Sequence, residues 1–284
     1  MVILVTGASG QLGHDVIKEL TERGHTVRGV SSREMELTDP AAVQRVLYSL
    51  RPEAVIHCGG YTAVDAAEDD AVRCDAVNRL GTDSIARACA DIRAKLLYIS
   101  TDYVFSGAGT APWRTEDLPR PLSVYGKSKY GGELAVQQSL REYFIVRVSW
   151  LFGPHGKNFV KTMLRLGQTH DTLRVVNDQI GTPTYTPDLA RLAADMIVTE
   201  KYGIYHAANE GGYISWYDFA CEIFRQAGMS VQVQPVSTAE YGLSRAARPC
   251  NSRLDKSRLA ENGFALLPDW KDALHRFLIE TEQI

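Results

Sequence analysis

The sequence predicts an α/β fold built on a doubly wound parallel sheet, with a smaller C-terminal α+β part. Short apolar runs rich in β-branched residues alternate with longer segments of helical periodicity up to about residue 150. This alternation is typical of right-handed crossover units, which place helices on both faces of a parallel sheet. Beyond residue 150 the alternation weakens, which indicates a different kind of structure.

The elements follow in order along the chain. The strands predicted for the sheet are residues 2–6, 26–30, 54–58, 95–100 and 144–149, and the helices between them are 11–23, 41–50, 66–91 and 124–141. The later elements are a helix at 158–166, a strand at 173–176, a helix at 187–200, an apolar run at 203–206 that could rejoin the sheet, a helix at 216–227, a strand at 231–235 and a last helix at 270–280.

Composition excludes several classes of partner. The chain has 284 residues, 45% hydrophobic and 23% charged, with a formal net charge of -3 and interspersed charges. Without a basic run, nucleic acid and anionic membranes are poor partners. The apolar run after Met1 is too short to cross a bilayer and lacks the features of a signal peptide. Since the five cysteines are scattered, we expect reduced thiols and a cytoplasmic location.

A glycine-rich turn, Gly7-Ala-Ser-Gly-Gln-Leu-Gly13, follows the first predicted strand and leads into a helix. Such a turn lets backbone N–H groups approach a pyrophosphate at the helix N-terminus, so we predict a dinucleotide cofactor. The second strand ends in Gly29-Val-Ser-Ser-Arg33, without the acidic residue that usually binds the adenosine ribose of NAD. An Arg beside Ser hydroxyls suits a 2′-phosphate, which favours NADPH, with NADH as the alternative.

The predicted cofactor contacts lie in this turn, after the second and third strands, and in the fourth helix. They are Gly7, Ser9, Gly10, Gln11, Leu12, Gly13, Ser32, Arg33, Glu36, Leu37, Gly59, Gly60, Tyr61, Thr62, Tyr125 and Lys129. The pattern predicts a dinucleotide-binding domain over residues 1–152, joined by segments within 173–208. Residues 153–284 are then mainly a substrate-binding domain, with the binding cleft between the two.

Tyr125 and Lys129 are the candidate catalytic pair. They lie one turn apart on a predicted helix, so both side chains are on one face. A nearby ammonium favours the phenolate, so we expect Lys129 to lower the pKa of Tyr125 and make it a general acid or base. Thr101 directly follows the fourth strand, where doubly wound folds bind their ligands, and its hydroxyl can orient a substrate carbonyl. A hydride from the nicotinamide and a proton from Tyr125 would then reduce that carbonyl.

Further stretches accompany the glycine turn and Tyr125-Gly-Lys-Ser-Lys129, both of which are generic to a large superfamily. These are Tyr61-Thr-Ala-Val-Asp-Ala-Ala-Glu68, Ile99-Ser-Thr-Asp-Tyr-Val-Phe-Ser-Gly107, Arg147-Val-Ser-Trp-Leu-Phe-Gly153, Asp178-Gln-Ile-Gly-Thr-Pro-Thr184 and Arg248-Pro-Cys-Asn-Ser-Arg-Leu-Asp255. With these stretches the chain resembles, over essentially its full length, the extended short-chain dehydrogenase/reductases and, within them, the dTDP-4-dehydrorhamnose reductases.

This resemblance implies a Rossmann-type fold and reduction of the 4-keto group of dTDP-4-dehydro-L-rhamnose by NADPH or NADH to give dTDP-L-rhamnose. It places the catalytic set on Thr101, Tyr125 and Lys129. Related dehydratases carry Asp-Glu directly after the catalytic Thr, and this chain has Asp102-Tyr103 instead, which favours plain reduction. The substrate contacts that the resemblance implies are Val64, Asp102, Trp150, Asn158 and Arg248.

Two alternatives stay open at this point. One is a non-catalytic, NADP-binding subunit that resembles the regulatory β subunit of methionine adenosyltransferase. The other is an epimerase or reductase that acts on another nucleotide sugar. The resemblance also allows a homodimer. Some members bind Mg²⁺ through acidic side chains at a dimer contact, near the places of Asp15 and Asp188, but the shorter carboxylate at 15 leaves Mg²⁺ open and we predict no metal ligands.

Overall fold

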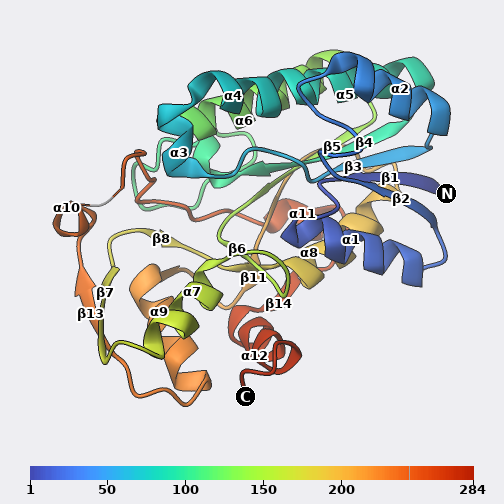
Figure 1. Cartoon of the computed structure of the whole chain (residues 1–284). Helices are drawn as coiled ribbons and strands as arrows, with labels where there is room; N and C mark the ends of the chain where they lie inside the picture. Colours follow the sequence, from blue (N-terminus) through green and yellow to red (C-terminus); the bar gives the residue numbers. More distant parts are fainter. Residues whose placement is uncertain (243) are drawn as a thin grey trace.

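The computed structural model describes residues 1–242 and 244–284, and its centre is a six-stranded parallel sheet (Figure 1). The strands are β1 (Val2–Thr6), β2 (Thr26–Val30), β3 (Ala54–His57), β4 (Lys95–Thr101), β5 (Tyr143–Val148) and β10 (Gly203–Ala207). Their order is β10-β5-β4-β3-β1-β2, and every neighbouring pair is parallel. The predicted doubly wound sheet is confirmed. Its winding reverses between β1 and β3, where such folds bind their ligands.

Helices cover both faces of the sheet, which is why its strands are apolar runs. In Figure 1, α2 (Pro40–Leu50), α5 (Gly81–Ile92) and α6 (Val124–Ser139) lie above the sheet, while α1 (Gln11–Glu22) and α8 (Thr186–Ile197) lie below it. Consecutive strand residues point to opposite faces. Leu4 and Leu96 therefore belong to the core under α2 and α5, whereas Val5 and Leu97 belong to the core shared with α1 and α8.

The segment predicted as helical over residues 66–91 is helical in the structure, but it is broken at Asp70. It contains α3 (Val64–Asp69), α4 (Ala71–Asp75), the π-helical segment η1 (Ala76–Leu80) and α5. Asp70, with a φ of -131°, separates α3 from α4. It also caps α4, since its side chain accepts a hydrogen bond from the Arg73 N–H. Asp favours such capping positions over helix interiors.

The C-terminal part contains a small lobe of three helices and one strand pair. Its helices are α7 (Phe159–Gly167), α9 (Trp216–Gln226) and α12 (Trp270–Glu280), and β7 (Thr172–Val176) pairs in parallel with β13 (Gln232–Val236). A separate apolar cluster that includes Phe152, Phe219 and Phe277 fills its centre. The apolar run predicted at 203–206 lies in β10, at the edge of the main sheet beside β5. The domain boundaries stay a prediction.

Several short elements were not predicted. They are η2 (Asp102–Val104), β6 (Leu151–Phe152), β8 (Ile180–Gly181), β9 (Thr184–Tyr185), β11 (Asn209–Glu210), β12 (Ile214–Ser215), α10 (Thr238–Tyr241), α11 (Ser257–Glu261) and β14 (Leu267–Asp269). Within the residues that the structure describes, no helix is both long enough and apolar enough to span a membrane.

Candidate functional site

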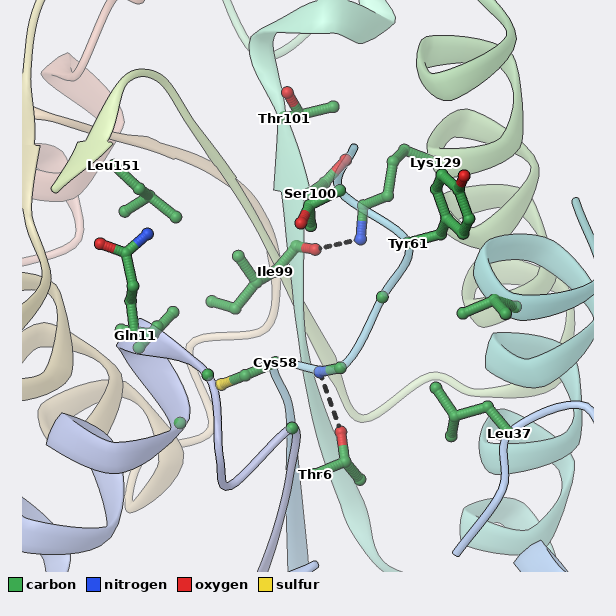
Figure 2. Close-up of a pocket in the computed structure, with 18 of the residues that line it drawn as sticks. Thr6, Gln11, Leu37, Cys58, Tyr61, Ile99, Ser100, Thr101, Lys129 and Leu151 are labelled. Carbon is green, nitrogen blue, oxygen red and sulfur yellow. Dashed lines mark hydrogen bonds between the residues drawn. The ribbon is translucent and has the colours of Figure 1, made fainter. Parts of the chain in front are cut away.

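A cavity of about 650 Å³ opens at the carboxyl ends of β1, β3 and β4. Figure 2 shows part of its wall, with Thr6, Ile99 and Lys129 on neighbouring elements. Most of the predicted site residues line this one cavity: Gly7, Ser9, Gly10, Gln11, Leu12, Gly13, Ser32, Glu36, Leu37, Gly59, Gly60, Tyr61, Thr62, Val64, Thr101, Asp102, Tyr125, Lys129 and Trp150.

The glycine turn brings three backbone segments into direct contact. Gly7 has a φ of +67°, and a Cβ on it would lie 2.7 Å from the Gly59 nitrogen. A Cβ on Gly13 would lie 2.1 Å from the Gly7 carbonyl oxygen. Helix α1 begins beside this turn with Gly10 at its N-cap, no side-chain cap and no acidic residue in its first turn. Its first N–H groups thus face the cavity without a competing anion, which fits the phosphates of a dinucleotide.

Buried hydrogen bonds hold the segment around Gly59 against the end of β1. The Gly59 N–H donates to the Thr6 hydroxyl at 3.1 Å (Figure 2). The Thr6 hydroxyl lies 2.6 Å from Nδ1 of His57, whose Nε2 lies 3.1 Å from the Thr82 hydroxyl. Burial lowers the pKa of His57 to about 3. His57 is therefore a neutral structural residue that supports the cofactor loop from behind.

Lys129 is buried in the floor of the cavity. Helix α6 begins at the Ser123 N-cap, whose hydroxyl accepts the Gly126 N–H at 3.1 Å, and this start places Lys129 in the second turn. Its Nζ donates to the Ile99 carbonyl at 2.7 Å (Figure 2) and lies 4.1 Å from the centre of the Tyr98 ring. Burial lowers the pKa of Lys129 to about 7, because the ammonium loses its hydration.

The pKa of Tyr125 is not lowered as expected, because Lys129 is not among the groups that shift this pKa most. Burial raises the pKa of Tyr125 above its ordinary value, and a hydrogen bond with the Thr101 hydroxyl, which lowers it, does not offset burial. The physical reason is that the Lys129 ammonium is directed at the Ile99 carbonyl and the Tyr98 ring. Tyr125 is thus held as a neutral phenol, the form that donates a proton.

Thr101 and Asp102 form the end of β4. The Thr101 hydroxyl accepts the Tyr103 N–H at 3.2 Å and donates to Oδ1 of Asp102 at 3.0 Å. Asp102 is 2% exposed, and burial raises its pKa to about 6. Hydrogen bonds from Ser252 and Thr101, which lower this pKa, do not offset burial.

A buried ion pair supports the catalytic helix from below. Arg147 on β5 donates to both carboxylate oxygens of Glu133 on α6, at 2.9 and 2.7 Å, and the Ser100 hydroxyl donates to the same carboxylate. Asn78 connects η1 to the loop that follows β3, because its side chain donates to the Tyr61 carbonyl and accepts the Tyr61 N–H. The cofactor loop and α6 are thereby fixed to the sheet.

Three predicted site residues lie outside the cavity lining. Arg33 is exposed at the end of β2. Asn158 caps α7 and donates to Oε1 of Gln11 at 2.9 Å, so its polar atoms are already used. Arg248 donates to Oδ2 of Asp65 at 2.6 Å and to the hydroxyl of the lining residue Tyr103 at 3.1 Å. Their ligand contacts stay predictions.

One residue in the wall, and one that packs against the wall, were missed from the sequence. Arg73 lines the cavity from α4, and no motif marked it, because its position depends on the interruption at Asp70. Trp216 lies face to face with Trp150, with ring centres 3.7 Å apart and an angle of 15°. Trp150 has a φ of +50°, which non-glycine residues rarely adopt. Neither the stack nor the strained backbone leaves a periodic signal in the sequence.

Comparisons with known proteins agree with this geometry. The family described as RmlD substrate binding domain matches residues 1–283. The dTDP-4-dehydrorhamnose reductase of Streptomyces griseus is 43% identical over 279 residues, which cover 95% of this chain and 91% of that protein. Spore coat polysaccharide biosynthesis protein SpsK of Bacillus subtilis is 38% identical over 98% of this chain and 97% of its own.

A similar solved structure is the dTDP-4-dehydrorhamnose reductase of Bacillus anthracis in complex with NADP. It is 43% identical, with a TM-score of 0.95 over 99% of both chains. The sequence match and the structural match both extend over nearly the whole length, including the glycine turn and the helix that carries Tyr125. The chain therefore belongs to the RmlD substrate binding domain family, in agreement with its predicted resemblance to the dTDP-4-dehydrorhamnose reductases.

Proposed function

We propose that this protein reduces the 4-keto group of dTDP-4-dehydro-L-rhamnose with NADPH to give dTDP-L-rhamnose. The observation that carries the proposal is that Thr101, Tyr125 and Lys129 lie around the same cavity as the glycine turn. The names of the Streptomyces griseus and Bacillus anthracis relatives support the substrate. The NADP in the Bacillus anthracis complex supports the choice of cofactor.

The chain supplies the proton and the orientation that carbonyl reduction needs. When bound, the reduced nicotinamide provides the hydride for the carbonyl carbon. The carbonyl oxygen takes the proton of Tyr125, which burial keeps protonated. The Thr101 hydroxyl, next to Asp102 and Tyr125, orients the same oxygen. Lys129, from the cavity floor, is suited to bind the nicotinamide ribose.

The surroundings of Thr101 favour reduction over dehydration. Eliminating water requires a further acid and base beside the carbonyl, and the residue after Asp102 is Tyr103. The Tyr103 hydroxyl accepts a hydrogen bond from Arg248, and burial raises the pKa of Tyr103 to about 12. This side chain is therefore a poor base at neutral pH, and Asp102 is left as the one carboxyl directly beside Thr101.

A direct assay tests the proposal. The purified protein is mixed with dTDP-4-dehydro-L-rhamnose and NADPH, and the absorbance of the reduced cofactor is followed while nucleotide-sugar products are separated by chromatography. We expect stoichiometric NADPH oxidation and formation of dTDP-L-rhamnose. Tight NADPH binding with no oxidation would instead indicate the non-catalytic subunit. Conversion of the sugar without net oxidation would indicate an epimerase.

Two further expectations belong with this proposal. The resemblance allows a homodimer, and sedimentation equilibrium would determine the mass of the particle. A cytoplasmic location is in keeping with a substrate and cofactor that are small, charged molecules, and fractionation of cells that express the protein would test it. Both stay predictions.

A further inference from the structure

The end of β2 is in contact with a carboxylate, although no acidic residue directly follows this strand. The chain turns back after the strand, because the Glu34 N–H donates to the Ser31 carbonyl at 3.1 Å. Oε2 of Glu34 accepts the Ser31 N–H at 2.8 Å and the Ser31 hydroxyl at 3.0 Å. The Glu34 side chain is 45% exposed, and Arg28 pairs with its other oxygen at 3.4 Å. The turn thus returns a negative charge to the end of the strand.

Ser31 lies where the adenosine ribose of a dinucleotide is expected. The Ala8 N–H donates to the Val30 carbonyl at 3.1 Å, so the glycine turn lies directly against the end of β2. The cavity lining includes this turn, Ser31, Ser32 and the apolar side chain of Leu37. A pyrophosphate at the turn and an adenine against apolar side chains are joined by the ribose, which such folds bind at the end of the second strand.

The Glu34 carboxylate already uses the hydrogen-bond donors that a 2′-phosphate needs. Hydrogen bonds from the Ser31 N–H and hydroxyl lower the pKa of Glu34, so the carboxylate is charged at neutral pH. A phosphate oxygen at this place would bind the same two donors and would meet a like charge a few ångströms away. The 2′-hydroxyl of NADH is neutral and can donate to a carboxylate, so it meets no such repulsion.

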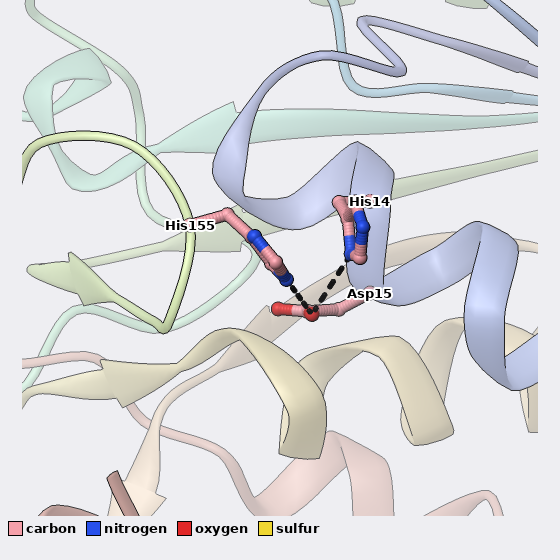
Figure 3. Close-up of side chains that lie close together, drawn as sticks. All are labelled: His14, Asp15 and His155. Carbon is pink, nitrogen blue, oxygen red and sulfur yellow. Dashed lines mark ion pairs between the residues drawn. The ribbon is translucent and has the colours of Figure 1, made fainter. Parts of the chain in front are cut away.

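Two other carboxylates near the glycine turn are directed at their own neighbours. Glu36 lines the cavity, but its carboxylate accepts the Thr38 N–H and hydroxyl at 3.2 and 3.1 Å. Asp15 lies on the helix that follows the turn, and ring nitrogens of His14 and His155 lie 3.8 and 3.9 Å from one of its oxygens (Figure 3). None of these last three residues lines the cavity. Neither carboxylate is therefore directed at the end of β2.

We propose that Glu34 limits the preference of this protein for NADPH over NADH, because its carboxylate occupies the Ser31 donors that the 2′-phosphate would use. This role rests on the proposed function, which supplies the nicotinamide cofactor. The exposed Arg33 acts in the opposite direction, since a guanidinium attracts a phosphate. NADPH binds with the Glu34 carboxylate displaced from Ser31, whereas NADH binding leaves this contact in place.

The test compares the binding of NADPH and NADH to the full chain by isothermal calorimetry, without a sugar substrate. In Glu34→Gln, the ratio of the NADH Kd to the NADPH Kd should rise by about 5- to 20-fold, the effect of removing one like charge near a phosphate at a protein surface. NADH affinity should stay close to that of the parent, which also verifies folding. Glu34→Lys should raise the ratio further. Because salt screens exposed charges, the gain should shrink in about 0.5 M salt.

Glu53→Gln is the matched control. Glu53 is 59% exposed and accepts the Val2 N–H at 2.6 Å, but Val2 begins β1, at the edge of the sheet opposite to the cavity. Its Kd ratio should equal that of the parent. A ratio in Glu34→Gln no higher than in this control, or an equal gain in affinity for both cofactors, would overturn the proposal. Failure to reduce the sugar would contradict the proposed function and leave these binding ratios unchanged.

Discussion

At the scale of single residues, Tyr125 is kept protonated by burial, which raises the pKa of its phenol. Tyr125→Phe removes the proton donor and leaves the ring that lies edge-on to Tyr103. We expect turnover to fall by about two to four orders of magnitude, the usual value of a positioned acid, with little change in NADPH affinity. NADPH oxidation and calorimetric binding measure the two effects.

Tyr130, on the same helix, provides the matched control for that experiment. It is half-buried against Val104 and Phe105, so Tyr130→Phe tests loss of a hydroxyl on α6 away from Thr101. Its turnover should stay close to that of the parent protein. Equal turnover in Tyr125→Phe and Tyr130→Phe would remove Tyr125 from the mechanism.

Lys129 makes the stability of the fold depend on pH. Its pKa falls from the ordinary 10.5 to about 7 in the folded protein, so between these pH values the unfolded chain binds more protons. The free energy of unfolding must then rise with pH in this window, by up to about 1.4 kcal/mol per pH unit. Relative to Lys129→Met, the parent protein should gain stability between pH 7 and 10 in urea titrations. Lys127→Met, at an exposed position on the same helix, should follow the parent at every pH.

At the scale of elements, the start of α1 depends on direct backbone contact at Gly13. A methyl group there would lie 2.1 Å from the Gly7 oxygen and 2.7 Å from its carbonyl carbon, so backbone has to move. We expect Gly13→Ala to cost about 1–3 kcal/mol, the usual cost of overpacking, and to weaken NADPH binding. Urea unfolding and calorimetry measure these effects.

A substitution at Gly10 distinguishes the effect of this turn on stability from its effect on NADPH binding. It has a φ of -84°, and the closest atom to an added Cβ is the Gly7 oxygen at 3.2 Å. Gly10→Ala should keep the free energy of unfolding within about 1 kcal/mol of the parent, which is the scale of a changed N-cap. The methyl group should still weaken NADPH binding, because Gly10 lines the cavity. Unchanged affinity in Gly10→Ala would move the phosphates away from this turn.

The helices and strands that could be predicted are those whose own residues carry a local pattern of apolar side chains. Strands buried on both faces must be apolar, so β1, β3, β4 and β5 are visible as short runs. The helical segment predicted at 66–91 is present, but its break was not predicted, since the apolar periodicity continues across Asp70 and the break depends on the cap at that residue. The two-residue strands β6, β8, β9, β11 and β12 are too short for periodicity and are determined by their partners.

Some features of the candidate site could likewise be predicted from the sequence, and others could not. Thr101 and the glycine turn were predictable, because the ends of parallel strands meet at one edge of the sheet. The pKa of Tyr125 was not, since it depends on burial and on the direction of the Lys129 ammonium. His155 and Trp216 come from distant parts of the chain, and only the packed structure brings them against Asp15 and Trp150.

At the scale of the whole molecule, one buried carboxylate connects the sheet layer to the small lobe. Asp188 is on α8, which packs below the sheet, and it binds Arg276 on α12 and Asn209 in β11. The Asn209 carboxamide in turn accepts the Tyr185 N–H at 2.7 Å and donates to the Pro268 carbonyl. The position of the small lobe relative to the sheet therefore depends on these hydrogen bonds between the two parts.

Removing the arginine should expose this dependence. Arg276→Met leaves the fully buried Asp188 without its bidentate hydrogen-bond donor. Loss of one member of a buried ion pair costs about 3–5 kcal/mol of folding stability. Because Arg191 still pairs with Asp188, we expect a value near the lower end in urea unfolding. In the control Arg225→Met, a guanidinium that is 68% exposed loses its pair with Glu222 on α9, and the loss should be about 1 kcal/mol. Adding Asp188→Asn to Arg276→Met should recover part of the loss, since the unpaired charge is then gone. Equal losses in the two arginine variants would mean that the layers are held together by apolar contacts alone.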